Sequence, residues 1–164
     1  MEKVIVIFGA PNTNKTTGHA LENYMKKNKI VCDYFFDCFK IAPLPCCDCG
    51  YCKKNSACKF SDLNEFYSNF ESADRVIIAF PVYNAGFPAP LKALIDRLQV
   101  YYNARFVRNI KPPISKHKSV TIISVCGSDN DYKSVITAQI CPAFTVTNCT
   151  LDEYICIKNT DNNL

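Results

Sequence analysis

The sequence predicts an α/β fold with a doubly wound parallel sheet of five strands in the order 2-1-3-4-5. Two observations lead to this prediction. Apolar runs rich in β-branched residues recur along the chain, and amphipathic helical patterns lie between them. The runs are mostly continuous rather than alternating, as expected for strands buried on both faces of a parallel sheet. The length of 164 residues favours a single domain over residues 1–164.

The strands are predicted from the apolar runs in chain order. Three of these runs are strong, the second in sequence is a weaker candidate, and the last is the weakest. The expected strands are 4–8, 30–36, 76–80, 120–125 and 154–157. Because each strand is separated from the next by a helical or irregular segment, right-handed crossovers would bring all five into one sheet.

Four helical patterns connect these strands. The first has an apolar face formed by Ala20, Leu21, Tyr24 and Met25. Ser61 is expected to cap the second helix, and Pro88 to open the third, where the fixed φ of proline is tolerated. The fourth is expected over about 131–140, ending before Pro142. Residues 38–60 form a long irregular insertion, and such loops are usually functional.

Composition excludes several functional classes. No stretch approaches the roughly 18 apolar residues of a membrane span, and the first residues lack the pattern of a signal peptide. A cytoplasmic location is therefore expected. The formal net charge is +4, but the basic residues are scattered, whereas a nucleic-acid-binding protein needs a basic face or stripe.

The loop after the first strand is the main candidate binding loop. In doubly wound sheets ligands bind beyond the carboxyl ends of the strands, which selects the loops after residues 8, 80 and 125. The first reads FGAPNTNKTT and differs from the P-loop pattern by Asn14 in place of a glycine. No carboxylate follows the 76–80 strand to hold magnesium. A phosphate monoester held by hydroxyl, amide and backbone N–H groups is favoured over a nucleoside triphosphate or a ligand-free helix start.

Three stretches resemble the NAD(P)H-dependent FMN reductase and iron–sulfur flavoprotein group of the flavodoxin-like superfamily. The first loop is similar to the phosphate loop G-S-P-R-x-x-G-N-T, with Ala10 for Ser and Asn12 for Arg. ADRVIIAFPVYNAGFPAPLKALIDR resembles a second signature, a strand followed by P-x-Y and a helix containing L-K-x-x-[IL]-D-R. CCDCGYCKKNSACKFSDL resembles the cysteine loop of the group. Similarity covers roughly residues 3–128, and motifs in this order are more specific than any one alone.

This resemblance implies an FMN site built from the three loops. The ribityl phosphate would lie on the first loop and the isoalloxazine ring against the second, near the backbone N–H groups of Tyr83 and Asn84. Gly127 would let the third loop approach the pyrimidine edge closely. Arg97 is implied to be structural, with no side chain required as a general acid. The expected FMN-binding residues are Ala10, Asn12, Asn14, Lys15, Thr16, Thr17, Pro81, Val82, Tyr83, Asn84, Cys126, Gly127 and Ser128.

The chain contains eleven cysteines, an odd number, and no evident export signal, which favours reduced thiols over disulfides. Four in the insertion have x2, x2 and x5 spacings: Cys46, Cys49, Cys52 and Cys58. This spacing can hold a [4Fe–4S] cluster or a tetrahedral zinc ion, and free redox-reactive thiols are the third possibility. The resemblance implies the cluster. Four scattered cysteines are expected to be small buried apolar residues: Cys126, Cys141, Cys149 and Cys156.

Three functions are consistent with these features. The first is an FMN oxidoreductase that takes hydride from NADH or NADPH and reduces a flavin, quinone or other small-molecule or protein acceptor. The second is an electron carrier, flavodoxin-like or linked to an iron–sulfur cluster, and the third is a nucleotide-binding switch. Flavodoxins are usually strongly acidic, and the basic balance of this chain favours the enzyme. The resemblance also implies a homodimer.

Overall fold

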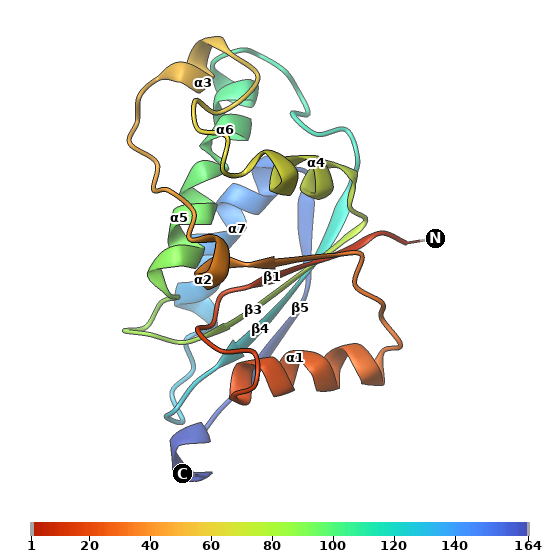
Figure 1. Cartoon of the computed structure of the whole chain (residues 1–164), viewed down its shortest axis with the longest axis vertical. Helices are drawn as coiled ribbons and strands as arrows, with labels where there is room; N and C mark the ends of the chain where they lie inside the picture. The colour runs from red at the N-terminus through yellow and green to blue at the C-terminus, as the bar shows by residue number, and fades with distance from the viewer. Residues whose placement is uncertain (1, 164) are drawn as a thin grey trace.

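A single sheet of five parallel strands forms the centre of the protein (Figure 1). The computed structural model describes residues 2–163. The strand order is β2-β1-β3-β4-β5, which confirms the fold predicted from the sequence. The strands are β1 (Val4–Phe8), β2 (Tyr34–Asp37), β3 (Arg75–Pro81), β4 (Lys118–Val125) and β5 (Cys149–Ile157).

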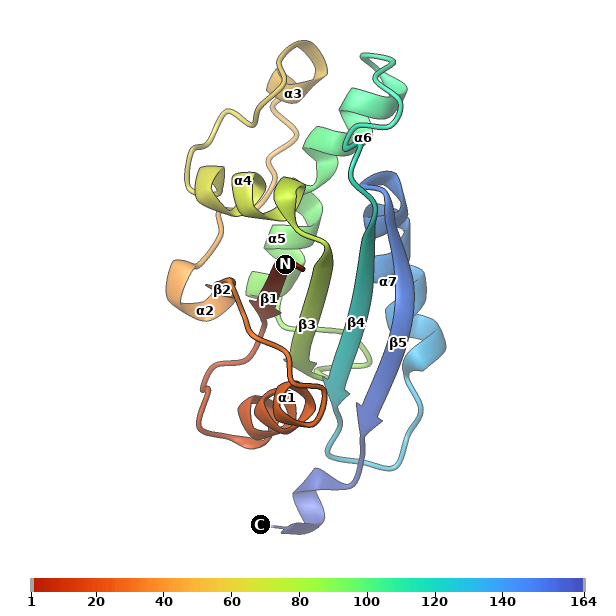
Figure 2. The same cartoon turned by 90° about the vertical axis from the view of Figure 1, so that its right-hand side faces the viewer.

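Helices cover both faces of this sheet. They are α1 (Thr16–Lys27), α2 (Cys38–Ile41), α3 (Tyr51–Lys54), α4 (Asn64–Ser72), α5 (Ala89–Arg97), α6 (Gln99–Phe106), α7 (Lys133–Val146) and the 3-10 helix η1 (Thr160–Asn163). Of the helices in the described chain, α1 alone lies on one face, whereas α4, α5 and α7 lie on the other (Figures 1 and 2). Leu21 of α1 therefore packs in a separate apolar core from Phe66 of α4 and Leu91 of α5.

None of these helices has both the length and the apolar character needed to cross a bilayer. The longest of them in the described chain, α7, has 14 residues, fewer than the roughly 20 that a membrane span requires.

The ends of several elements differ from the sequence prediction. β2 begins only at Tyr34, because Asp33 caps the start of the neighbouring strand and accepts from Val4 N at 2.7 Å. The fourth helix does not end before Pro142 but continues to residue 146, since buried Phe144 extends its apolar stripe past the proline. The expected Ser61 cap is also wrong. α4 starts at Asn64 without a side-chain cap, and Ser61 contributes its backbone carbonyl, which accepts from Asn64 N at 3.1 Å.

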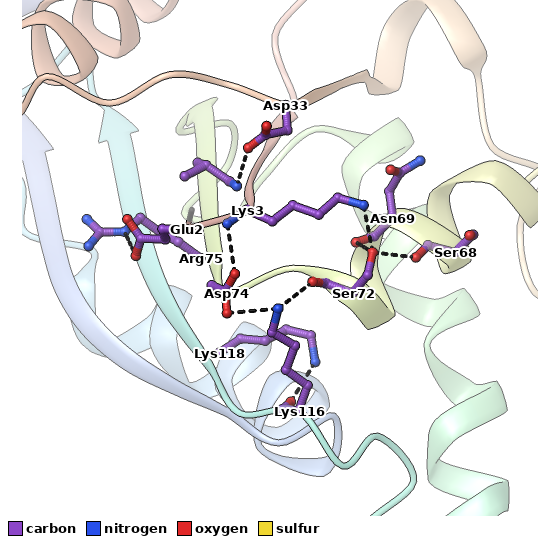
Figure 3. Close-up of polar contacts among 11 residues, drawn as sticks. Glu2, Lys3, Asp33, Ser68, Asn69, Ser72, Asp74, Arg75, Lys116 and Lys118 are labelled. Atoms are coloured by element: carbon purple, nitrogen blue, oxygen red, sulfur yellow. Dashed lines mark hydrogen bonds and ion pairs between the residues drawn. The ribbon is translucent and has the colours of Figure 1, made fainter.

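Hydrogen bonds and ion pairs close the amino edge of the sheet (Figure 3). Lys3 N donates to the Asp74 carboxylate at 2.8 Å, and Lys3 Nζ donates to Ser72 Oγ at 2.7 Å. Lys116 Nζ pairs with Asp74 at 2.8 Å, and its hydrogen bond lowers the pKa of that carboxyl group. These contacts tie the start of β1 to the segments that precede β3 and β4.

Candidate functional site

A cavity of about 540 Å³ lies beyond the carboxyl ends of β1, β3 and β4. These strand ends are brought side by side by the register of the sheet, in which Phe8 is opposite Ala79 and Pro81 is opposite Val125. The cavity is lined by Ala10, Pro11, Asn12, Lys15, Thr16, Thr17, Pro81, Val82, Tyr83, Val125, Gly127, Thr160 and Asp161. Its volume falls in the range of about 300–1,000 Å³ that is typical of small-molecule sites.

The first wall is the loop between β1 and α1. The Asn12 side chain accepts from Asn14 N at 2.8 Å and turns the chain toward the helix. Gly18 lets this loop lie against α1, because a Cβ atom there would be 1.7 Å from the Thr13 carbonyl oxygen. Lys15 precedes the helix, and the first turn of α1 has neither an acidic residue nor a side-chain cap. The loop therefore presents a positive helix end and an ammonium group to the cavity.

The second wall is the end of β3 and the tight turn that follows. Tyr83 N donates to Gly86 O at 3.1 Å, and Gly86 N donates back to Tyr83 O at 2.9 Å. Asn84 and Ala85, between them, both have positive φ values of 51° and 60°. The Tyr83 N–H is thus engaged within the turn rather than free for a ligand, in contrast to the expectation from sequence. The Tyr83 side chain is 47% exposed and supplies an aromatic surface on the cavity wall.

The third wall combines the loop after β4 with a segment that the sequence did not identify. Thr160 N donates to Cys126 O at 3.3 Å, and Asp161 N donates to Gly127 O at 3.4 Å. Both Thr160 and Asp161 line the cavity. One signal pointed to this segment: it directly follows β5, whose carboxyl end lies at the same edge of the sheet as the binding loops.

The structure brings most of the expected ligand-binding residues around this one cavity: Ala10, Asn12, Lys15, Thr16, Thr17, Pro81, Val82, Tyr83 and Gly127. The others lie in the same loops but are not among its lining residues. They are Asn14, Asn84, Cys126 and Ser128. Cys126 is buried with its sulfur 3.4 Å from Ser128 Oγ, so the two side chains contact each other.

The cysteine loop forms a second, much smaller cavity of about 20 Å³. The four cysteines of the spaced pattern line it together with Cys47: Cys46, Cys49, Cys52 and Cys58. Asn103 Nδ2 donates to Cys52 Sγ at 3.1 Å. Within residues 2–163, no three or more cysteine, histidine or carboxylate side chains are close enough together to hold a metal ion. The thiol chemistry suits a metal, but the side chains of this loop are not gathered around one point.

Arg97 makes hydrogen bonds to both ends of this loop, at Leu44 on one side and at Phe60 and Asp62 on the other. Its guanidinium donates to the Asp62 carboxylate at 2.8 and 3.3 Å, to Leu44 O at 2.9 Å and to Phe60 O at 3.3 Å. Burial opposes ionisation of Asp62, but the hydrogen bonds from Arg97 and Leu44 N outweigh it and lower the pKa of this carboxyl group. Arg97 Nε is buried without a hydrogen-bond partner among the described residues. The arginine is thus structural within one chain.

The scattered cysteines are only partly as expected. Cys126 and Cys149 are buried, whereas Cys141 and Cys156 are half-buried. Burial raises the pKa of the Cys149 thiol, which keeps it protonated and unreactive.

Comparisons with known proteins agree with this geometry. The model of the family described as NADPH-dependent FMN reductase matches residues 2–149. An iron–sulfur flavoprotein of Methanosarcina thermophila is 33% identical over 133 residues, 78% of this chain and 65% of that protein. One of Methanocaldococcus jannaschii is 30% identical over 149 residues, 88% of this chain and 71% of its own length. The chain thus spans slightly less than two thirds of the first relative.

Solved structures share the fold at low sequence identity. An FMN-dependent NADH-azoreductase of Bacillus anthracis, in complex with FMN, has a TM-score of 0.64 at 14% identity, covering 98% of this chain and 88% of its own. An NAD(P)H:quinone oxidoreductase of Methanothermobacter marburgensis has a TM-score of 0.65 at 14% identity, and the match covers 93% of this chain and 83% of that protein. With the family model matching most of its length, the chain belongs to the NADPH-dependent FMN reductase family.

Proposed function

We propose that this chain binds FMN in the 540 Å³ cavity and acts as an NAD(P)H-dependent oxidoreductase. One observation carries the proposal: a positive phosphate-type loop and an aromatic strand end, far apart in sequence, line the same cavity at the carboxyl edge of the sheet. FMN is also the molecule that the family description names.

The first loop suits the phosphate end of this ligand. Lys15 offers a positive charge, and Thr16 and Thr17 offer hydroxyl groups beside the start of α1. Oriented N–H groups and a cation together favour an anion, and neither needs a metal ion. Lys15 would replace the charge that Arg supplies at the position of Asn12 in related loops.

The second loop suits the flavin ring. Pro81, Val82 and Tyr83 form a mainly apolar wall with one exposed aromatic side chain. When bound, FMN supplies the redox chemistry, accepting a hydride (two electrons and one proton) from the nicotinamide and passing two electrons to an acceptor. The residues of the chain bind and orient the cofactor, and the wall excludes water from one side of it.

The acceptor is proposed to be a flavin, quinone or similar small planar molecule. The observation that favours a planar acceptor is the mainly apolar wall of Pro81, Val82 and Tyr83, against which a flat ring can lie beside the flavin.

The test is anaerobic reduction. Protein loaded with FMN is mixed with NADH or NADPH, and loss of the visible flavin absorbance is followed. One equivalent of nicotinamide is expected to bleach one flavin, and addition of a quinone should restore the colour. A flavin that is bound but reduced only by dithionite would instead favour the electron carrier. A chain that binds magnesium–GTP or magnesium–ATP and no FMN would contradict both.

The cysteine loop supports a second, related proposal. The relatives reported above are named iron–sulfur flavoproteins, and five cysteines of this short loop line one small cavity. Their sulfur atoms are not gathered around one point, so a bound metal would have to draw them together. We propose that this loop is a metal-binding element, with a [4Fe–4S] cluster favoured over zinc. Metal and sulfide analysis of anaerobically purified protein decides between these and free thiols. The matched control is Cys141→Ser, a half-buried cysteine outside the loop, which should leave the metal content unchanged.

A homodimer is part of the same proposal. The helix α3 of the cysteine loop and the segment after β5 lie at opposite ends of the molecule (Figures 1 and 2). No residue of the 46–58 stretch lines the FMN-type cavity. The loop and the cavity are therefore separate within one chain, and we propose that a second copy of the chain brings a cysteine loop to each flavin. Light scattering after size exclusion should give twice the mass of 18.5 kDa. A monomeric mass would contradict this proposal.

A further inference from the structure

Residues 158–161 clasp the loop that follows β4. Asn159 N donates to Ser128 O at 3.1 Å, and Lys158 Nζ donates to Asp129 O at 3.0 Å. Thr160 bonds Cys126 O twice, through its N–H at 3.3 Å and its hydroxyl at 3.2 Å. We call residues 158–161 the clasp. Its contacts are mostly with the backbone, so they hold the third loop in place whatever side chains that loop carries.

The clasp places one carboxylate against the cavity. A Cβ atom on Gly127 would be only 2.1 Å from Asp161 Oδ2, so the carboxylate lies directly on the glycine. Asp161 and Lys15 are the charged residues among the described lining residues of the cavity. Lys15 belongs to the first loop at the start of α1, where a phosphate would bind. Asp161 belongs to the clasp and lies against Gly127, in the loop after β4 that is expected to approach the pyrimidine edge of the flavin.

We propose that Asp161 biases bound FMN toward its oxidised state, with the clasp as a fourth element of the site. The inference rests on the proposed function above. Reduction adds negative charge to the flavin ring but leaves the charge of the phosphate unchanged, and nearby charges shift the potential accordingly. A carboxylate on the cavity wall opposes that added charge, whereas Lys15 acts mainly on the phosphate. Reduced FMN therefore binds more weakly than it would without Asp161, and donates electrons more readily.

The test compares two dissociation constants. FMN binding is titrated in the oxidised state and, under nitrogen, in the dithionite-reduced state, with the wild type, Asp161→Asn and Asp129→Asn. Asp161→Asn should tighten reduced FMN relative to oxidised FMN about tenfold, the size expected for one partly solvated charge. For a two-electron couple this equals a rise in potential of about 30 mV. Asp129→Asn is the matched control, because it removes a carboxylate from the neighbouring loop after β4 that does not line the cavity. The Asp129 carboxylate makes long contacts with the clasp, 3.9 Å from Lys158 Nζ and 3.5 Å from Asn159 Nδ2, so this variant also controls for a shift of the clasp.

The outcomes separate the inference from the function on which it rests. The ratio of the two dissociation constants, reduced over oxidised, is compared between the variants and the wild type. If this ratio in Asp161→Asn is within twofold of the wild-type ratio, or if Asp129→Asn changes it equally, the role of Asp161 is overturned while FMN binding stands. A wild-type protein that binds no FMN in either state would overturn both.

A size test checks the packing independently of charge. Gly127→Ala should weaken binding of oxidised FMN at least about threefold, because the new Cβ must displace the Asp161 carboxylate. Combining it with Asp161→Gly removes the collision and should restore most of the affinity. Gly127→Ala with unchanged affinity, or a double variant as weak as the single one, would overturn the placement of the clasp.

Discussion

Arg97→Leu should destabilise the protein through the cysteine loop. The arginine side chain is 1% exposed and makes four hydrogen bonds, two of them to Asp62, whose side chain is 23% exposed. Removing one partner from a buried ion pair costs about 3–5 kcal/mol. Because Asp62 is partly exposed, water replaces some of the lost contact, and the expected loss in the free energy of unfolding is about 3 kcal/mol. For a domain of this length, each kcal/mol lowers Tm by roughly 2–4 °C, so Tm should fall by roughly 6–12 °C.

The assay is thermal unfolding followed by far-ultraviolet circular dichroism, with thiol labelling of the folded protein beside it. Lys92→Ala is the control, because its pair with Asp96 is about half exposed and belongs to the same helix. That pair should contribute at most about 0.5 kcal/mol. Arg97→Leu should also speed labelling of Cys52 and Cys58, which are half-buried. If Arg97→Leu has the same Tm as the Lys92→Ala control, the role of the arginine as an anchor of the loop is refuted.

Three further changes test other parts of the site. Tyr83→Ala should weaken FMN binding about threefold to tenfold, the value of one aromatic contact, without a change in Tm; unchanged affinity in a fluorescence titration would show that the ring does not contact Tyr83. Gly18→Ala should lower both Tm and FMN affinity, since its Cβ would meet the Thr13 carbonyl oxygen at 1.7 Å, and a fully stable variant with normal binding would contradict the described loop. Because the pKa of Asp62 is lowered in the folded protein, its contribution to stability is present above the unfolded value of about 3.9 and is lost as pH falls below it. Tm measured from pH 6 down to pH 3 should therefore fall less steeply in Asp62→Asn than in the wild type, and parallel curves would count against this linkage.

The fold could be predicted because its strands are buried on both faces. A short continuous apolar run such as residues 76–80 is typical of a strand buried on both faces of a parallel sheet. The amphipathic segments between such runs predict the helical crossovers that a parallel sheet needs. The walls of the site formed by the first two loops could be predicted for a related reason. Loops that follow β1 and β3 must leave the sheet at one edge, so the residues after Phe8 and after Phe80 were expected to meet.

Other features depend on contacts between distant residues and escape a local pattern. Pro142 normally ends a helix, but the apolar contacts of Ile140 and Phe144 on either side hold the helix together through it. Arg97 lies next to an apolar stripe, and nothing local indicates that Asp62 is its partner, 35 residues away. The clasp was missed because its contacts are mostly with the backbone, which no side-chain pattern specifies.

The central claim is that one cavity holds FMN with its phosphate at the start of α1. The most direct measurement is a titration of the flavin-free protein with FMN and with riboflavin, which lacks the phosphate, in the wild type and in Lys15→Ala. We expect one FMN per chain, bound at least about tenfold more tightly than riboflavin, with that preference reduced in Lys15→Ala. Equal affinity for the two flavins, or a preference for FMN that Lys15→Ala leaves intact, would contradict the account.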